Sequence, residues 1–324
     1  MTRIQGKVSV IIPARNEAYL QQTVDDLLAK AAGDIEIIVV LDGWWPNPAL
    51  KEDERVITLH RTEPKGMRPA INDAANMASG QYLLKTDAHC IFGEGYDEIL
   101  KADCDYDWLV VPTRHSIDIP TWTIRKRDYN YSMLTYPFLE SMYGAGFHAV
   151  TFNTEQNREI NRQRAAFDID DILSAQGSLW FQHTEYFLSF PPLDHERLYF
   201  YQEAQCVMLR ILAAGGRCVV TKKTAYGHMH KGKDHKGADG RPGRGFYLDV
   251  RKKRAAEALM TDWCIKGWPW PNAIRSFESM IEQHWWLISQ MKDPRYAWPN
   301  DWRDWEKHRA AFENRTPEQI PAHT

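Results

Sequence analysis

Short apolar runs alternate with longer segments of helical spacing through the first 112 residues. Continuous apolar runs that end at proline or at Asp-Gly are typical of buried parallel strands, and they predict strands at residues 7–13, 35–41, 56–59, 82–86 and 108–112. Apolar positions spaced three or four apart predict two helices, each followed by a glycine, over residues 17–32 and 67–78. This alternation predicts an α/β fold with an open, mostly parallel sheet and helices on both of its faces.

The rest of the chain has a weaker pattern. Three helices and a short strand are predicted, at residues 198–214, 250–263, 273–291 and 219–220. Eight of the thirteen tryptophans fall between Trp263 and Trp305, where packing of the rings is favoured over stacking on a ligand. We therefore predict one α/β domain over residues 1–248 and a helical, Trp-rich C-terminal extension over residues 249–324 that packs on it.

Composition places the chain among ordinary globular proteins. It has 324 residues, of which 44% are hydrophobic and 26% charged, enough to bury a core in one large domain or two fused ones. We find no signal peptide and no apolar stretch near the roughly 20 residues that cross a bilayer. Five cysteines without paired spacing indicate reduced thiols and predict a cytoplasmic location.

The net charge of −3 hides an uneven distribution. Residues 222–254 contain eleven Lys or Arg and three Asp, a local charge of +8, so the remaining chain carries −11. A block of this kind is usually a solvated loop, and it can also hold phosphate.

A candidate metal site follows the apolar run at residues 82–84. Side chains alternate along a strand, so Asp87 and His89 point the same way and can bind one cation together. Their mixed oxygen and nitrogen ligands suit Mn²⁺ better than Ca²⁺, although a plain surface turn has the same spacing. Residues 13–15 and Asp42 also lie at predicted strand ends, where ligands bind in open α/β sheets, and this convergence indicates an enzyme.

Several of these segments resemble glycosyltransferases with the GT-A (Rossmann-like) fold. Residues 8–18 resemble the first strand and turn of family 2 glycosyltransferases, and residues 38–42 resemble the second strand, whose acid commonly meets the nucleotide base. Asp87-Ala88-His89-Cys90 resembles the metal motif of polypeptide N-acetylgalactosaminyltransferases, in which Asp-x-His replaces Asp-x-Asp. The likeness runs from about residue 7 to residue 230. The chain is also similar to phage-borne glycosyltransferases with a long, Trp-rich C-terminus.

The acceptor side of the resemblance is less complete. Glu203, Arg210, Gly215 and Gly216 reproduce the spacing of the acceptor-side helix in the N-acetylgalactosaminyltransferases. In inverting family 2 enzymes this helix carries a Glu-Asp pair whose aspartate is the usual base, whereas here alanine follows Glu203. We also expect neither the lectin domain nor the membrane anchor of the secretory-pathway enzymes. Whether the enzyme retains or inverts stereochemistry therefore stays open.

The resemblance implies a set of site residues. Asp87, His89 and His228 are expected to bind Mn²⁺ or Mg²⁺, with His230 as an alternative to His228. Glu203 is expected to be catalytic, by taking the proton of an attacking hydroxyl, or to orient a sugar in a retaining enzyme. Contacts to the nucleotide-sugar donor are expected from Pro13, Ala14, Arg15, Glu17, Asp42, Arg68, Asp87, Lys231 and Arg244.

Two longer segments complete the expected site. Residues 113–172, rich in aromatic rings and arginine, are predicted to form an acceptor-side insert over the sheet edge, with simple packing as the alternative. Residues 229–246 form a glycine-rich basic loop that is expected to close over the donor, with Lys233 and Arg241 as further phosphate contacts.

We therefore expect a metal-dependent glycosyltransferase that uses a nucleotide sugar, with a UDP-sugar favoured. The favoured acceptor is a 5-hydroxymethylpyrimidine in phage DNA, modified in the host cytoplasm, because of the phage-like resemblance, the +8 segment and the aromatic residues. The alternatives are a hydroxyl of an envelope polysaccharide or of a protein, and a non-catalytic nucleic-acid-binding protein on the same fold. A nucleotidyltransferase is disfavoured because no glycine-rich, lysine-bearing loop follows the first strand.

Overall fold

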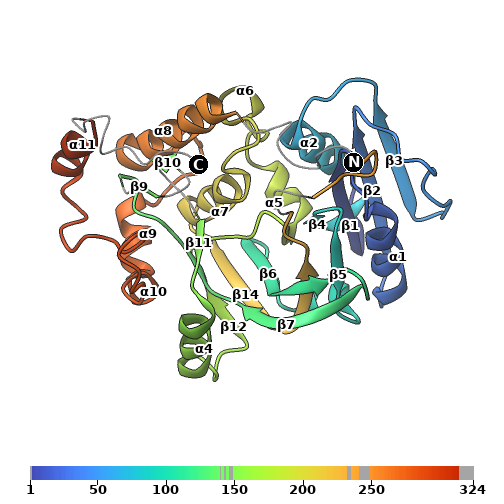
Figure 1. Ribbon diagram of the computed structural model, residues 1–324, viewed down its shortest axis with the longest axis horizontal. Coiled ribbons are helices and arrows are strands. Elements are labelled where there is room, and N and C mark those ends of the chain that lie inside the picture. Colours follow the sequence, from blue (N-terminus) through green and yellow to red (C-terminus); the bar gives the residue numbers. More distant parts are fainter. Residues whose placement is uncertain are drawn as a thin grey trace.

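The computed structural model describes residues 2–138, 140–141, 144–145, 149–231, 235–240 and 249–313. A ten-stranded central sheet runs through the middle of the molecule and has helices around it (Figure 1). Its strands are β1 (Ile4–Ala14), β2 (Ile35–Asp42), β3 (Val56–Arg61), β4 (Gly80–Thr86), β5 (Cys90–Phe92), β6 (Trp108–Asp118), β7 (Thr123–Tyr129), β12 (Ile169–Asp171), β13 (Leu179–His183) and β14 (Arg217–His228). Two small two-stranded sheets are formed by β8 (Ser132–Leu134) with β11 (Ala149–Thr151) and by β9 (Glu140–Ser141) with β10 (Gly144–Ala145).

The helices cover the sheet and form most of the C-terminal part. Their bounds are α1 (Leu20–Lys30), α2 (Met67–Met77), α3 (Tyr96–Ala102), α4 (Thr154–Gln163), α5 (Thr184–Leu188), α6 (His195–Leu198), α7 (Glu203–Ala213), α8 (Val250–Lys266), α9 (Phe277–Gln283), α10 (Trp285–Ile288) and α11 (Trp305–Glu313). In the described part of the chain, no helix combines the length and the apolar character that a membrane crossing needs.

The central sheet is mixed rather than mostly parallel. Strands β3, β2, β1 and β4 are parallel neighbours, as the continuous apolar runs predict. Strand β13 then lies antiparallel between β4 and β6, and β14 returns parallel to β6. The expectation of a mostly parallel sheet is therefore wrong for this half. An apolar run in the sequence shows that a strand is buried, but it does not show the direction of the strand.

The predicted insert over residues 113–172 lies partly within the sheet. Residues 113–118 extend β6, β7 pairs with β6, and β12 pairs with the edge of β14. Only the intervening segment, which carries the two small sheets and α4, stands outside the central sheet. The insert is therefore shorter than its predicted bounds.

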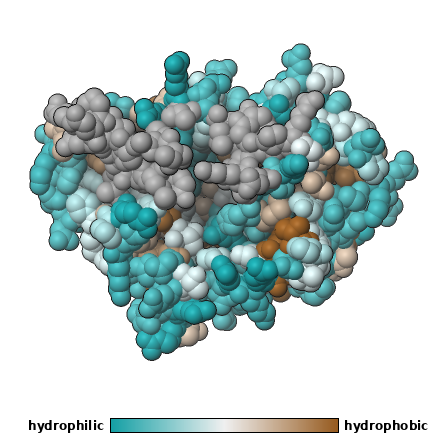
Figure 2. Space-filling model, in the orientation of Figure 1, coloured by the Kyte–Doolittle hydropathy of each residue, from teal (hydrophilic) through white to brown (hydrophobic). Residues whose placement is uncertain are grey.

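Both faces of the sheet are covered, which explains why its first strands are apolar throughout. Along β1, Val10 and Ile12 join a cluster with α1 and α3, whereas Ile11 joins a second cluster with α2 and α7. The second cluster continues into the C-terminal part through Trp263, Trp270 and other tryptophans. Helices α8 to α11 lie together on the side of the molecule opposite β3 (Figure 1). The face drawn in Figure 2 is mostly hydrophilic, and its largest apolar area lies right of centre.

Two predicted helices are interrupted. The helix expected over residues 198–214 begins only at Glu203 (α7), because Leu198 ends α6 and the intervening Tyr199 and Gln202 have positive φ of 52° and 58°. The helix expected over residues 273–291 is likewise divided into α9 and α10. The first interruption matters for the site, since it makes Glu203 the first residue of α7.

Candidate active site at the ends of the strands

A cleft of about 690 Å³ opens where β1, β2, β4 and β14 end. The loop before α7 and the first turn of α8 form its other side. Ten of the residues predicted for the site line this cleft: Pro13, Ala14, Arg15, Glu17, Asp42, Asp87, His89, Glu203, His228 and Lys231. The exposed side chain of His230 lines it too.

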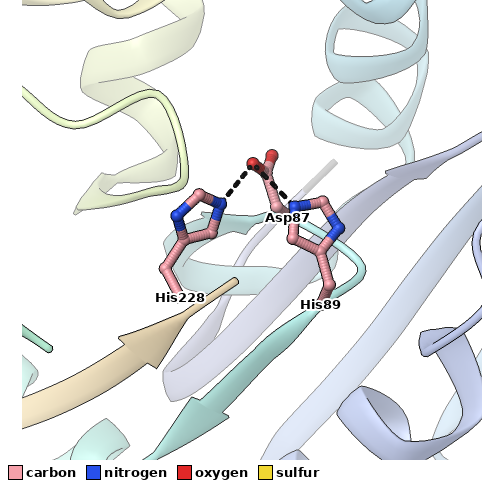
Figure 3. Close-up of side chains that lie close together, drawn as sticks. All are labelled: Asp87, His89 and His228. Atoms are coloured by element: carbon pink, nitrogen blue, oxygen red, sulfur yellow. Dashed lines mark ion pairs between the residues drawn. The ribbon is translucent and has the colours of Figure 1, made fainter. Parts of the chain in front are cut away.

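Asp87, His89 and His228 line this cleft and lie close together (Figure 3). Oδ2 of Asp87 lies 3.7 Å from Nε2 of His89 and 3.4 Å from Nε2 of His228. The three ligand atoms lie within 4.8 Å of one another. Two ligands that each lie about 2.1 Å from one ion are roughly 3–4 Å apart, so the spacing fits a single divalent cation.

The protonation of these side chains also fits a cation. Burial lowers the pKa of His228 to about 3, so its imidazole is neutral and free to ligate. Both ring nitrogens of His228 are buried and lack a hydrogen-bond partner within the described residues. Burial opposes ionisation of Asp87, but Lys85 and the two imidazoles hold its pKa well below the usual range. The chain thus presents one carboxylate and two imidazoles, the kind of donor set that suits Mn²⁺.

Glu17 contacts His89 at the ring nitrogen that is not part of the candidate metal site. Its Oε2 lies 3.1 Å from Nδ1 of His89, and its Oε1 accepts a hydrogen bond from Lys231 Nζ. Burial raises the pKa of Glu17, but His89 and Lys231 outweigh it and lower the pKa overall. A carboxylate on Nδ1 leaves Nε2 of the same imidazole for the metal. The contacts therefore favour a positioning role for Glu17 over the direct donor contact expected from the sequence.

Lys85 is a part of the site that sequence reasoning missed. It is fully buried on β4, and its Nζ lies 2.7 Å from Oδ1 of Asp87 and also donates to the carbonyl of Gly177. Burial by itself lowers the pKa of Lys85, but the carboxylates of Asp87 and Glu203 together have the larger effect, so its pKa is raised overall. A lone lysine within an apolar strand, two residues before the metal aspartate, was the available signal.

Glu203 lies beside the metal site with one oxygen unused. It is 3% exposed, and Nε1 of Trp180 donates to its Oε1 at 2.8 Å, while Oε2 has no hydrogen-bond partner within the described residues. Burial raises the pKa of Glu203 despite the opposing charge of Lys85. A buried carboxylate with a raised pKa and a free oxygen is suited to accept a proton.

Asp42 closes the far end of the cleft. Its Oδ1 is 3.0 Å from Nη1 of Arg61 and accepts from the amide of Lys65, and its Oδ2 accepts from the amide of Gly66. These bonds fix the loop that follows β3 against the end of β2. Asp42 therefore shapes this end of the cleft as well as lining it.

Arg68 does not take the expected position. Its side chain is fully buried, does not line the cleft, and donates from Nη2 to the carbonyl of Tyr201 at 2.6 Å. Arg68 follows the first residue of α2 on the face that packs inward, so the expected role as a phosphate contact is not supported. Arg244, Lys233 and Arg241 lie outside the described residues.

Comparison with known proteins supports one family. Residues 9–164 match the family described as Glycosyl transferase family 2. Glycosyltransferase GlyG of Streptococcus pneumoniae is 30% identical over 110 residues, which are 30% of this chain and 36% of that protein. The putative polypeptide N-acetylgalactosaminyltransferase 13 of Drosophila melanogaster is 30% identical over 143 residues, 38% of this chain and 26% of that protein. The chain thus spans little more than a third of one curated relative and about a quarter of the other.

Solved structures share the fold. GalNAc-T7 with UDP, GalNAc and Mn²⁺ superimposes with a TM-score of 0.58 at 16% identity, covering 89% of this chain and 58% of that chain. TarS of S. aureus in complex with UDP-GlcNAc gives a TM-score of 0.50 at 13% identity, covering 88% and 72%. The chain therefore shares the GT-A fold of these structures, and its residues 9–164 are similar to glycosyltransferase family 2. None of these four relatives is named as a phage protein, so the similarity to phage-borne enzymes stays a prediction.

Proposed function

We propose that this chain, whose residues 9–164 match glycosyltransferase family 2, is a metal-dependent glycosyltransferase that moves a sugar from a nucleotide-diphosphosugar to an acceptor hydroxyl. The observation that supports it most is the convergence of Asp87, His89 and His228 beside Glu203 in one cleft. Structural likeness alone carries less weight, because unrelated activities share folds.

The chemistry needs positive charge where the diphosphate leaves. A divalent ion held by Asp87, His89 and His228 would neutralise that developing charge. The protein contributes the geometry, since Lys85 and Glu17 hold Asp87 and His89 with one ligand atom each facing the cleft. Manganese is the proposed ion, with Mg²⁺ as the alternative.

The donor is proposed to lie along the ends of β1 and β2. Pro13, Ala14 and Arg15 form the wall next to the metal site, and Asp42 lies at the far end, where the nucleotide base would sit. UDP is the proposed nucleotide, because GalNAc-T7 and TarS, which share the fold, were solved with UDP or a UDP-sugar.

On the acceptor side, Glu203 is proposed to take the proton of the attacking hydroxyl. Its free Oε2 and raised pKa favour this role at neutral pH. The missing aspartate after Glu203 leaves no second carboxylate at the next position, so Glu203 would be the base of an inverting reaction or the orienting group of a retaining one.

Two acceptors have some support. The cleft is lined by Lys252 and Lys253 from the +8 segment, which favours an anionic acceptor such as hydroxymethylated DNA. The name of the Drosophila relative refers to polypeptides, which favours a protein hydroxyl. A cytoplasmic location belongs to the same proposal and is supported by five cysteines that are buried and free.

The test combines donor and acceptor assays. The purified chain is incubated with a panel of UDP-sugars and with Mn²⁺, Mg²⁺ or EDTA, and released UDP and the mass of candidate acceptors are measured. We expect UDP release that requires the metal and is lost in Asp87→Asn, with Asp105→Asn as the exposed control. Nucleic-acid binding that survives in Asp87→Asn, with no UDP release from the unaltered chain, would instead identify a non-catalytic binding protein.

The acceptors are separated by salt and by product. Transfer to hydroxymethylated DNA should fall steeply between 50 and 200 mM salt, by roughly 10³-fold or more if several phosphates are contacted. Transfer to a peptide or polysaccharide hydroxyl should change little over the same range.

A further inference from the structure

Arg114 on β6 is a buried arginine that lines the cleft, and no counter-ion lies beside it in the described part of the chain. Its side chain is 8% exposed, and Nη2 donates to Oγ1 of Thr151 at 3.3 Å. Among the described residues Nε has no hydrogen-bond partner, and the guanidinium carbon lies 5.1 Å from the ring centre of Tyr129. Within the part of the chain that the structure describes, no carboxylate pairs with Arg114.

Other buried arginines in this protein are held differently. Arg61, equally buried, is 3.0 Å from the carboxylate of Asp42. Arg68 and Arg210 lie outside the cleft, where the charge of Glu203 acts on both. Arg114 alone of these four arginines both lines the cleft and lacks a nearby carboxylate, so the cleft contains a positive charge that a bound group can neutralise.

The environment of Arg114 supports an unsatisfied charge. Burial lowers the pKa of Arg114, the direction expected when a guanidinium loses water without gaining an anion. Arginine nevertheless stays protonated in proteins at physiological pH. A buried charge without a partner is costly, and such groups are retained where a ligand or a reaction uses them.

The sheet register places Arg114 close to the metal site. Arg114 pairs with Tyr226 of β14, and His228 lies two residues farther along the same strand. A displacement of two residues along the strand, combined with the spacing between adjacent strands, places the Cα atoms of Arg114 and His228 about 8 Å apart. Cross-strand partners share a face of the sheet, so Arg114 and His228 face the same side.

Arg114 also lies several strands away from the proposed position of the nucleotide base. The strand order runs β14, β6, β13, β4, β1, β2, and Asp87 follows β4 in the middle. Asp42 ends β2, whereas Arg114 belongs to β6. Strands β13, β4 and β1 separate β6 from β2, so Arg114 is remote from the proposed base position, which favours a contact with the acceptor.

We propose that Arg114 forms an anion-binding subsite for the acceptor, which carries a phosphate or carboxylate next to the hydroxyl that receives the sugar. This proposal rests on the proposed glycosyltransferase function and narrows its acceptor to an anionic class. A guanidinium offers a fork of donors that matches the oxygens of either group. Cleft-lining Gln176 and Ser178 provide neutral polar side chains in the same cleft. Because Arg114 lies about 8 Å from His228, the anionic group must belong to the acceptor residue that bears the reacting hydroxyl or to the residue next to it in the acceptor.

The experiment measures binding of small anionic probes by calorimetry. Glycerol 3-phosphate, glucuronate and uncharged glycerol are titrated into the protein alone and into its complex with Mn²⁺ and UDP. We expect one or both anions to bind and glycerol not to bind, with Arg114→Gln weakening the anion by roughly 10- to 100-fold, the range for hydrogen bonds to a charged group. UDP affinity should change by less than twofold, and Arg114→Lys should lose less anion affinity than Arg114→Gln, because it keeps the charge but not the fork of donors.

Matched measurements keep the result interpretable. Arg127→Gln removes an exposed guanidinium from neighbouring β7 and should leave every affinity unchanged. If the thermal midpoint of Arg114→Gln is close to that of the unaltered chain, the variant is folded. If the midpoint is clearly lower, Arg114→Lys replaces Arg114→Gln as the variant whose anion binding is compared. The preferred anion distinguishes a phosphate-bearing acceptor from a carboxylate-bearing one.

Three results would overturn the inference. One is equal anion binding by Arg114→Gln and the unaltered chain, and another is no anion binding by either. The third is parallel loss of UDP and anion affinity in Arg114→Gln, which would assign the arginine to the donor diphosphate. Failure of the unaltered chain to bind UDP with Mn²⁺ would count against the glycosyltransferase function itself, while titration into the protein alone would still test the subsite.

Discussion

The ammonium group of Lys85 lies 2.7 Å from Oδ1 of Asp87, and the other oxygen of that carboxylate faces His89 and His228. Because Lys85 occupies one oxygen, Asp87 has only one left for a cation. The same lysine donates to the carbonyl of Gly177, which ties β4 to the segment before β13. Lys85 therefore determines which carboxylate oxygen of Asp87 is available to a metal ion.

Replacing this lysine should change metal selectivity. In Lys85→Met both oxygens of Asp87 become available, and Ca²⁺ accepts bidentate carboxylates more readily than ions with stricter geometry. We expect the ratio of Mn²⁺ to Ca²⁺ affinity to fall by roughly 10-fold, in line with other outer-shell substitutions. Competition calorimetry measures the ratio, with exposed Lys126→Met as the control. An unchanged ratio would show that Lys85 only fills space.

Loss of the Glu17 carboxylate should weaken the metal rather than the nucleotide. Glu17→Ala removes the group that holds Nδ1 of His89, so we expect Mn²⁺ affinity to fall by roughly 10- to 100-fold. UDP affinity at saturating Mn²⁺ should stay within twofold of the original, and exposed Glu52→Ala should change neither. The opposite pattern, intact Mn²⁺ binding with weaker UDP binding, would restore the donor contact expected from the sequence.

Glu203→Gln tests the acceptor-side base. The amide keeps an oxygen that can accept from Trp180 Nε1, so the fold and the binding of UDP with Mn²⁺ should be retained. Sugar transfer should fall by roughly 10²- to 10⁴-fold, the usual contribution of a general base. The measurement is the initial rate of UDP release with acceptor present, with exposed Glu196→Gln alongside. A loss below tenfold would leave Glu203 an orienting role only.

Glu257 on α8 predicts a pH dependence of stability that is independent of the metal site. It is 2% exposed, and burial raises its pKa to about 7 from an ordinary value of 4.5, although Lys253 lies 3.6 Å away. The folded protein therefore binds a proton that the unfolded chain has released between these pH values. The stabilisation is fully present below pH 4.5 and is lost as pH rises through 7.

Glu257→Gln should remove this dependence. The free energy of unfolding of the variant relative to the unaltered chain should rise between pH 5 and pH 8, by on the order of 2–3 kcal/mol. Urea unfolding at several pH values measures the difference, with exposed Glu278→Gln as the control. A constant difference across the range would show that Glu257 does not titrate there.

The C-terminal tryptophans should be needed for stability. Trp302 is 2% exposed and contacts the rings of Trp285, Trp298 and Trp305, and its carbonyl accepts from the hydroxyl of Tyr136. Trp302→Ala should lower the free energy of unfolding by about 3–5 kcal/mol, as for other buried aromatic residues.

Denaturant unfolding checks this and shows how the extension folds. Trp45, which is 53% exposed, is the matched control, and Trp45→Ala should cost less than about 1 kcal/mol. A single transition in Trp302→Ala would mean that the extension unfolds together with the α/β part. A separate early transition would mean that residues 249–324 fold on their own.

The sequence by itself determined the parallel half of the sheet and half of the metal site. Apolar runs and helical spacing are local signals, so β1, β2, β4, α1 and α2 are found within a few residues of their predicted bounds. Asp87 and His89 are two residues apart, and the alternation of side chains after β4 places both toward the cleft without any long-range information.

Only the tertiary structure decided the remaining neighbours. His228 reaches Asp87 because β14 pairs antiparallel with β5, with His228 opposite Cys90, next to His89. The register of β14 on β6 places Arg114 near the same site. The periodicity of a single strand predicts neither of these pairings and does not predict the direction of β13. Register and direction depend on the neighbouring strand and on the surrounding core.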